Sequence, residues 1–123
     1  SSPTATPTPA WAFRVIAKER LCGGETRPGY IFIYVEDEQG KGLPNVELRV
    51  IWEDGEERFF TGLKPDVDPG YADFAMTPGV EYAVTISTAA DEESEVVEGL
   101  STAGCPPVDG QILSSWHIVF QEQ

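Results

Sequence analysis

Residues 46–61 read Val-Glu-Leu-Arg-Val-Ile-Trp-Glu-Asp-Gly-Glu-Glu-Arg-Phe-Phe-Thr, and this stretch decides the fold class. Val46, Leu48, Val50 and Trp52 alternate with Glu47, Arg49 and Glu53, which is the period of a strand with one buried face. Asp54-Gly55 is a two-residue hairpin signal, and residues 58–61 lead back as the partner strand. The stretch therefore predicts a β-hairpin.

The same period of two recurs on both sides of this hairpin. Residues 30–35 are apolar on both faces, which is typical of a central strand. Residues 89–99 are rich in Glu and Ala and could form a short helical turn. Residues 95–98 within them fit a short edge strand equally well, so both alternatives stay open. The other expected strands, each bounded by Gly- or Pro-containing turns, are 11–18, 72–76, 80–86 and 116–120. Seven or eight short strands at this spacing predict an all-β, antiparallel β-sandwich.

Two stretches resemble a known family. Val-Glu-Asp-Glu-Gln-Gly-Lys-Gly-Leu-Pro-Asn-Val at 35–46 is similar to the strand–turn–strand of carboxypeptidase-regulatory-like and Cna-B-type modules. Gly-Tyr-Ala-Asp-Phe-Ala-Met-Thr-Pro-Gly-Val-Glu-Tyr-Ala-Val at 70–84 resembles a hairpin of the same family. The resemblance implies an immunoglobulin-like, prealbumin-like sandwich. It implies no single function, because this fold hosts many roles.

Some members of that family carry an isopeptide bond between a lysine of the first strand and an Asn or Asp of the last. Lys18 lies in the expected first strand, but residues 114–123 contain neither Asn nor Asp. This departure from the family pattern predicts that the cross-link is absent.

The first ten residues differ in composition from the rest. Ser-Ser-Pro-Thr-Ala-Thr-Pro-Thr-Pro-Ala offers nothing apolar to pack and is typical of a semi-extended linker or stalk. We expect residues 1–10 to connect to a neighbouring domain of a longer parent protein, and residues 11–123 to form one β-sandwich domain.

The excess of acidic over basic residues disfavours some classes of binding partner. Acidic residues number 21 against 8 basic ones, giving a formal net charge of −13. This charge repels nucleic acid and anionic membranes, which both need Lys or Arg to replace counterions. No apolar run approaches the ~20 residues needed to span a bilayer. We therefore expect no nucleic acid partner and no membrane insertion.

Two cysteines, Cys22 and Cys105, lie beside Gly-Gly and Pro-Pro and so in expected loops. An even pair in a chain of extracellular character predicts one disulfide, worth about 4.5 kcal/mol in the chain-entropy model. Two unpaired thiols are the alternative. The expected location is secreted or cell-surface.

Catalytic and metal sites are hard to find in this sequence. The single histidine, His117, follows Ser114 and Ser115 along one strand, where neighbours point to opposite faces or lie too far apart for a Ser–His pair. Asp66, Asp68 and Asp73 lie in one loop-rich stretch that could offer oxygens to calcium, but the EF-hand pattern fails there. We expect no enzyme, no cofactor and no metal, with calcium at these three aspartates as the weaker alternative.

Aromatic residues are numerous for a small sandwich, and most are expected in the core. Tyr71 is the candidate for an exposed ring that stacks on a sugar. Two functions remain open: a non-catalytic accessory module that spaces, stabilises or adheres, and a carbohydrate-binding module attached to a polysaccharide-degrading enzyme. A planar patch of two or three solvent-facing rings would favour the polysaccharide ligand.

Overall fold

The computed structural model describes residues 11–22, 27–88, 92–106 and 113–123. The linker predicted at 1–10 and part of the helical alternative at 89–99 lie outside these residues. Within them the chain forms nine strands and no helix: β1 (Trp11–Leu21), β2 (Tyr30–Glu36), β3 (Glu47–Trp52), β4 (Gly55–Phe60), β5 (Tyr71–Ala75), β6 (Tyr82–Ile86), β7 (Glu93–Ser94), β8 (Val97–Leu100) and β9 (Ser115–Glu122).

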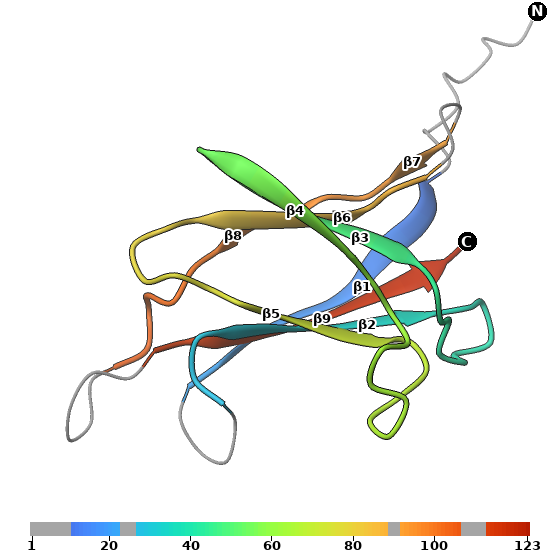
Figure 1. Ribbon diagram of the computed structural model, residues 1–123, viewed down its shortest axis with the longest axis horizontal. Helices are drawn as coiled ribbons and strands as arrows, with labels where there is room; N and C mark the ends of the chain where they lie inside the picture. The colour runs from blue at the N-terminus through green and yellow to red at the C-terminus, as the bar shows by residue number, and fades with distance from the viewer. Residues whose placement is uncertain (1–10, 23–26, 89–91, 107–112) are drawn as a thin grey trace, which may run out of the picture.

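The strands form two facing sheets, as Figure 1 shows. One sheet has the order β5-β2-β9-β1-β7 and the other the order β4-β3-β6-β8. The predicted all-β sandwich is therefore confirmed. Among the described strands five pairings are antiparallel, but β2–β9 and β1–β7 are parallel. The expected antiparallel character is therefore confirmed for most pairings, and the two parallel ones are an addition that the sequence pattern could not reveal, because the period of two does not encode the direction of a partner strand.

The core lies between the two sheets. On β2 the side chains of Ile31, Ile33 and Val35 point inward and are almost fully buried, while the alternate residues face outward. Other inward-facing residues with 0% exposure come from β3, β6, β8 and β9: Leu48, Val50, Val84, Leu100, Ile118 and Phe120.

A β-bulge shifts the faces of β1. The register with β9 pairs Val15 with Phe120 and Ala17 with Val119, so Ile16 is the extra residue. Strict alternation over 11–17 predicts that Val15 and Ala17 share a face, but one added residue exchanges the two faces of a strand, so they lie on opposite faces. Lys18 lies on the face of β1 that is directed toward the opposite sheet, where it stays exposed and donates a 2.9 Å hydrogen bond to the Glu98 carbonyl.

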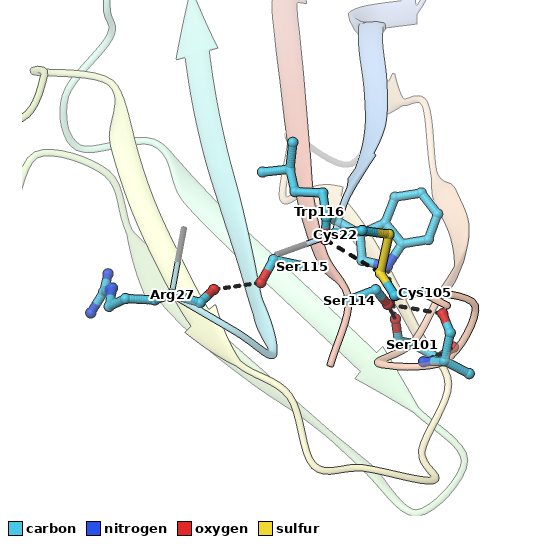
Figure 2. The surroundings of a disulfide bond; sticks show 9 residues. Cys22, Arg27, Ser101, Cys105, Ser114, Ser115 and Trp116 are labelled. Atoms are coloured by element: carbon cyan, nitrogen blue, oxygen red, sulfur yellow. Dashed lines mark hydrogen bonds between the residues drawn. A yellow bond between two sulfur atoms is a disulfide. The ribbon is translucent and has the colours of Figure 1, made fainter. Parts of the chain in front are cut away.

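The predicted disulfide between Cys22 and Cys105 is present, with 5.4 Å between the two Cα atoms. It joins the end of β1 to the segment that follows β8, 83 residues later in the chain. Figure 2 shows the Trp116 indole beside the disulfide. The indole nitrogen donates a 2.9 Å hydrogen bond to the Ser101 carbonyl. These contacts secure one end of the sandwich.

One turn differs in detail from the prediction. The hairpin between β3 and β4 turns at Glu53 and Asp54, one residue earlier than Asp54-Gly55. In the turn that follows β2, Gly40 has a positive φ of +85°, which favours glycine. Gly42 is needed for a different reason, because a Cβ atom there would collide with Asp68 and with the backbone of Gly70.

The short segment near residue 97 is a strand. β8 pairs with β6 at the edge of its sheet, so the edge-strand alternative is confirmed, beginning at Val97 and ending at Leu100. In the part of the chain that the structure describes, no helix is long and apolar enough to span a membrane.

Candidate functional site

The outer face of the five-stranded sheet carries a row of aromatic side chains. Tyr30, Phe32 and Tyr34 alternate with the buried isoleucines of β2 and are only partly buried. The Tyr30 and Phe32 rings lie nearly parallel, at 15°, with centroids 5.9 Å apart. The imidazole ring of His117, on β9, packs edge-on against the Tyr34 ring, with 5.3 Å between the two ring centroids. We call these four residues the aromatic surface.

Tyr71 does not have the exposed ring that was predicted. Its residue exposure is 5%, so the expectation of a solvent-facing ring at Tyr71 was wrong, while a sugar contact there stays a prediction. The register pairs Tyr71 with Tyr34, and their ring centroids are 5.2 Å apart. Tyr71 therefore borders the aromatic surface, and the accessible rings are those of β2.

A polar cluster adjoins the aromatic surface on β5. One carboxylate oxygen of Asp73, Oδ2, accepts hydrogen bonds from Arg27 Nη2 at 2.9 Å, Lys64 Nζ at 2.8 Å and the Tyr71 hydroxyl at 2.8 Å. The Arg27 guanidinium also lies 4.3 Å from the centroid of the Tyr30 ring, at cation–π distance. Asp73 therefore holds a cation over one end of the aromatic row.

These contacts shift the protonation of the cluster. Burial acts to raise the pKa of Asp73, but hydrogen bonds from Lys64, Tyr71 and Arg27 outweigh it and hold the pKa below its ordinary value. Burial and the hydrogen bond to Asp73 raise the pKa of Tyr71. The hydrogen bond to Asp73 raises the pKa of Arg27. At neutral pH the cluster thus combines two cations, one carboxylate and a neutral phenol.

The three aspartates considered for calcium have separate roles. Asp68 Oδ1 accepts a 2.8 Å hydrogen bond from the Gly70 amide within its own turn. Asp73 is held in the cluster described above, and Asp66 is exposed. In the described parts of the chain, no three His, Cys, Asp or Glu residues gather as they would around a metal ion.

The serines beside His117 serve the fold. The Ser114 hydroxyl donates to the carbonyls of Ser101 and Ala103, at 2.7 and 2.9 Å. The Ser115 hydroxyl donates to the Arg27 carbonyl at 2.6 Å and accepts the Tyr30 amide at 3.1 Å. Figure 2 shows Ser115 directed toward Arg27 and Ser114 toward Ser101. The local hydrogen bonds connect β9 to two loops.

Sequence reasoning missed most of this site. The rings of β2 were counted among the core aromatics, although the signal for them was present. In residues 30–35 every second residue is aromatic and the others are aliphatic. Such a pattern separates an aliphatic inner face from an aromatic outer one. No local pattern pointed to Arg27 or Lys64, which come from loops.

Comparisons with known proteins give little beyond this geometry. No protein-family model matches the chain, and no curated protein matches it significantly. Two solved structures of the pilus adhesin SpaC from Lactobacillus rhamnosus GG are weakly similar. The open conformation has 12% identity and a TM-score of 0.44 over 77% of this chain and 14% of that one. A C-terminal fragment has 13% identity and a TM-score of 0.45 over 79% and 46%.

This chain thus spans less than half the length of each of those structures. The likeness to Cna-B-type modules remains one of local sequence pattern. The sandwich architecture itself is established by the strand order and register of the chain.

Proposed function

We propose that this chain is a non-catalytic accessory module of a larger secreted or cell-surface protein, in which it spaces, stabilises or adheres. The observation that carries the proposal is the use of its polar groups. The hydroxyls of Ser114 and Ser115 donate to backbone carbonyls, and Asp73 accepts three donors. A catalytic site would instead gather a base, its orienting partner and an oxyanion donor around one pocket.

The disulfide supports an extracellular location, because such bonds persist in oxidising compartments. The net charge of −13 favours a soluble module and disfavours nucleic acid and anionic membranes as partners. The expected partners are a neighbouring domain of the parent protein and, under the second candidate function, a polysaccharide.

The second candidate function is carbohydrate binding, and the aromatic surface favours it. Sugar-binding sites combine flat aromatic faces with a few placed polar groups. Tyr30, Phe32 and Tyr34 supply the rings, while Arg27 and Asp73 supply a donor and an acceptor at the same edge. Under this candidate the module directs an attached polysaccharide-degrading enzyme to its substrate.

Retention on a glycan array and on polysaccharide columns tests the second candidate. We expect Phe32→Ala to weaken retention by about tenfold, since stacking on one ring is worth on the order of 1 kcal/mol or more. Retention should depend only weakly on salt, because stacking is not a charge effect. Val96→Ala, at an exposed site on the segment before β8, is the matched control. If no glycan is retained, carbohydrate binding is refuted and the spacer function stands.

Turnover assays test the non-catalytic claim separately. The isolated domain is incubated with glycoside, ester and peptide substrates, and we expect no turnover. Turnover that His117→Ala abolishes would refute the claim.

A further inference from the structure

A cavity of about 400 Å³ opens between the two free sheet edges on one side of the sandwich. β4 is the terminal strand of one sheet and β5 of the other. In Figure 1 they approach each other where residues 61–70 connect them and spread apart from there. Phe59 and Phe74 line the cavity, with ring centroids 6.1 Å apart and planes at 13°.

The rim of this cavity is apolar and exposed. Phe60 is 47% exposed and Leu63 77% exposed, and both line the opening. Large apolar side chains gathered around one opening are typical of a contact surface. The cavity shares Tyr71, Asp73 and Lys64 with the polar cluster beside the aromatic surface, so the two proposed sites adjoin one another. Leu63 lines the cavity and Phe32 belongs to the aromatic surface, so variants at these two residues test the two proposals separately.

The backbone of β4 identifies the kind of occupant. Thr61 exchanges hydrogen bonds with the β3 side, through Val46 and Asn45. Because strand residues alternate in direction, Glu56, Arg58 and Phe60 turn their amides and carbonyls away from β3. Within the described residues no strand pairs with that edge. A row of free backbone donors and acceptors is complementary to another extended chain.

The charged residues that line the cavity indicate which charge its occupant should carry. Asp73 is already bound by Lys64 and Arg27. Glu57 also lines the cavity, and no ion pair among the described residues involves it. A second copy of this chain would bring another net charge of −13 and be repelled. A basic side chain would complement Glu57.

We propose that this opening binds an extended peptide segment of a partner protein, which adds to the edge of β4 as a further strand. Its alternate apolar side chains enter the cavity over Phe59 and Phe74, and a Lys or Arg meets Glu57. Main-chain hydrogen bonds to Glu56, Arg58 and Phe60 provide affinity, and the cavity provides selectivity.

The test uses three synthetic octapeptides with blocked ends. The first alternates Val with Thr and has Lys near both ends, the second replaces Lys by Glu, and the third N-methylates every second residue. Amide hydrogen exchange of the domain is followed by NMR. We expect the first peptide to slow exchange at Arg58 and Phe60 by about tenfold. The N-methylated peptide should not, since it cannot donate to the edge.

Variants locate the contact. Leu63→Gln should weaken binding of the Lys peptide by about tenfold, because it places an uncharged polar side chain in the apolar rim. Val67→Gln is the matched control, since Val67 is 54% exposed in the same loop but does not line the cavity. Both sites are exposed, so the fold should be retained. The proposal is overturned if exchange at Arg58 and Phe60 is unchanged, or if the Glu or N-methylated peptide binds as tightly as the first.

Discussion

Tyr71 donates its hydroxyl to Asp73 in a 2.8 Å hydrogen bond, although both residues belong to the same strand. Residues two apart on a strand face the same side, so this contact lies along the outer face of β5. The oxygen it reaches also receives Lys64 and Arg27. One carboxylate therefore organises the loops at both ends of the strand.

Asp73→Asn tests this arrangement through its pH dependence. The pKa of Asp73 is lowered in the folded protein, so its contribution to stability is present above the unfolded pKa, near 3.9, and is lost as pH falls through the folded pKa. We expect the variant to lose about 1–2 kcal/mol of unfolding free energy at pH 7 and to approach wild type in strong acid. Urea unfolding at a series of pH values from 7 to 2 measures the loss of unfolding free energy at neutral pH and its disappearance in acid. Asp66→Asn, at an exposed aspartate, serves as the control, and a pH-independent difference would contradict the assignment.

The disulfide should dominate the stability of the end of the sandwich shown in Figure 2. Replacing Cys22 and Cys105 together by Ser should cost about 2–5 kcal/mol, because the bond closes a long loop in the unfolded chain. Urea unfolding of the double variant measures the loss, and reduced wild type should show the same loss. Two thiols that alkylate freely in native, unreduced protein would contradict the bond.

Gly70 permits the closest backbone approach in the 61–70 connection. A Cβ atom there would collide with the carbonyl of Val35, and the backbone of Gly42 and Leu43 lies close by as well. Since backbone cannot yield as a side-chain tip can, Gly70→Ala should cost about 3 kcal/mol or more. Gly40→Ala is the comparison, because that position is open and only its positive φ is strained, at about 1 kcal/mol. Equal losses in thermal unfolding would refute the steric argument.

Alternation in the sequence predicted the sandwich because each strand buries one face. It could not predict the parallel contact of β2 with β9, since those strands are separated by most of the chain. Nor could it reveal the bulge at Ile16. This residue is apolar like Val15 and Ala17, so the alternation of apolar and polar residues does not distinguish it. Strict alternation therefore predicts the faces of β1 beyond Ile16 in reverse.

The candidate site shows the same limit. Tyr71 and Asp73 are two residues apart, so alternation places them on one face of a strand, opposite Ala72 and Phe74, and a face away from the core suggested an exposed ring. Whether such a ring stays exposed depends on its neighbours in space. Tyr34 packs against Tyr71 across the strand pair, while Arg27 and Lys64 arrive from loops. Those contacts are set by tertiary structure and have no local signal.

The absence of an isopeptide bond is a prediction that intact mass can check. The Lys18 amine lies 2.9 Å from the main-chain carbonyl of Glu98, and a carbonyl of the peptide backbone is not an acyl donor for such a bond. We expect the mass of the native protein to be lower than that of the reduced chain by two hydrogens only. A further loss of ammonia or water would show a cross-link.

Calcium should leave the protein unchanged. A calcium site needs several oxygens directed at one point, and a ligand present at 100 times its Kd would add about 2.7 kcal/mol of stability. Asp68 is committed to the Gly70 amide and Asp73 to three donors, while Asp66 stands apart in solvent. Gathering them would require breaking the cluster on β5. We therefore expect the same Tm, within about 1 °C, in millimolar calcium chloride and in EDTA. Magnesium chloride at equal ionic strength separates a bound ion from screening of the acidic surface. A saturable rise in Tm with calcium alone, lost in Asp66→Asn, would establish the site that this geometry argues against.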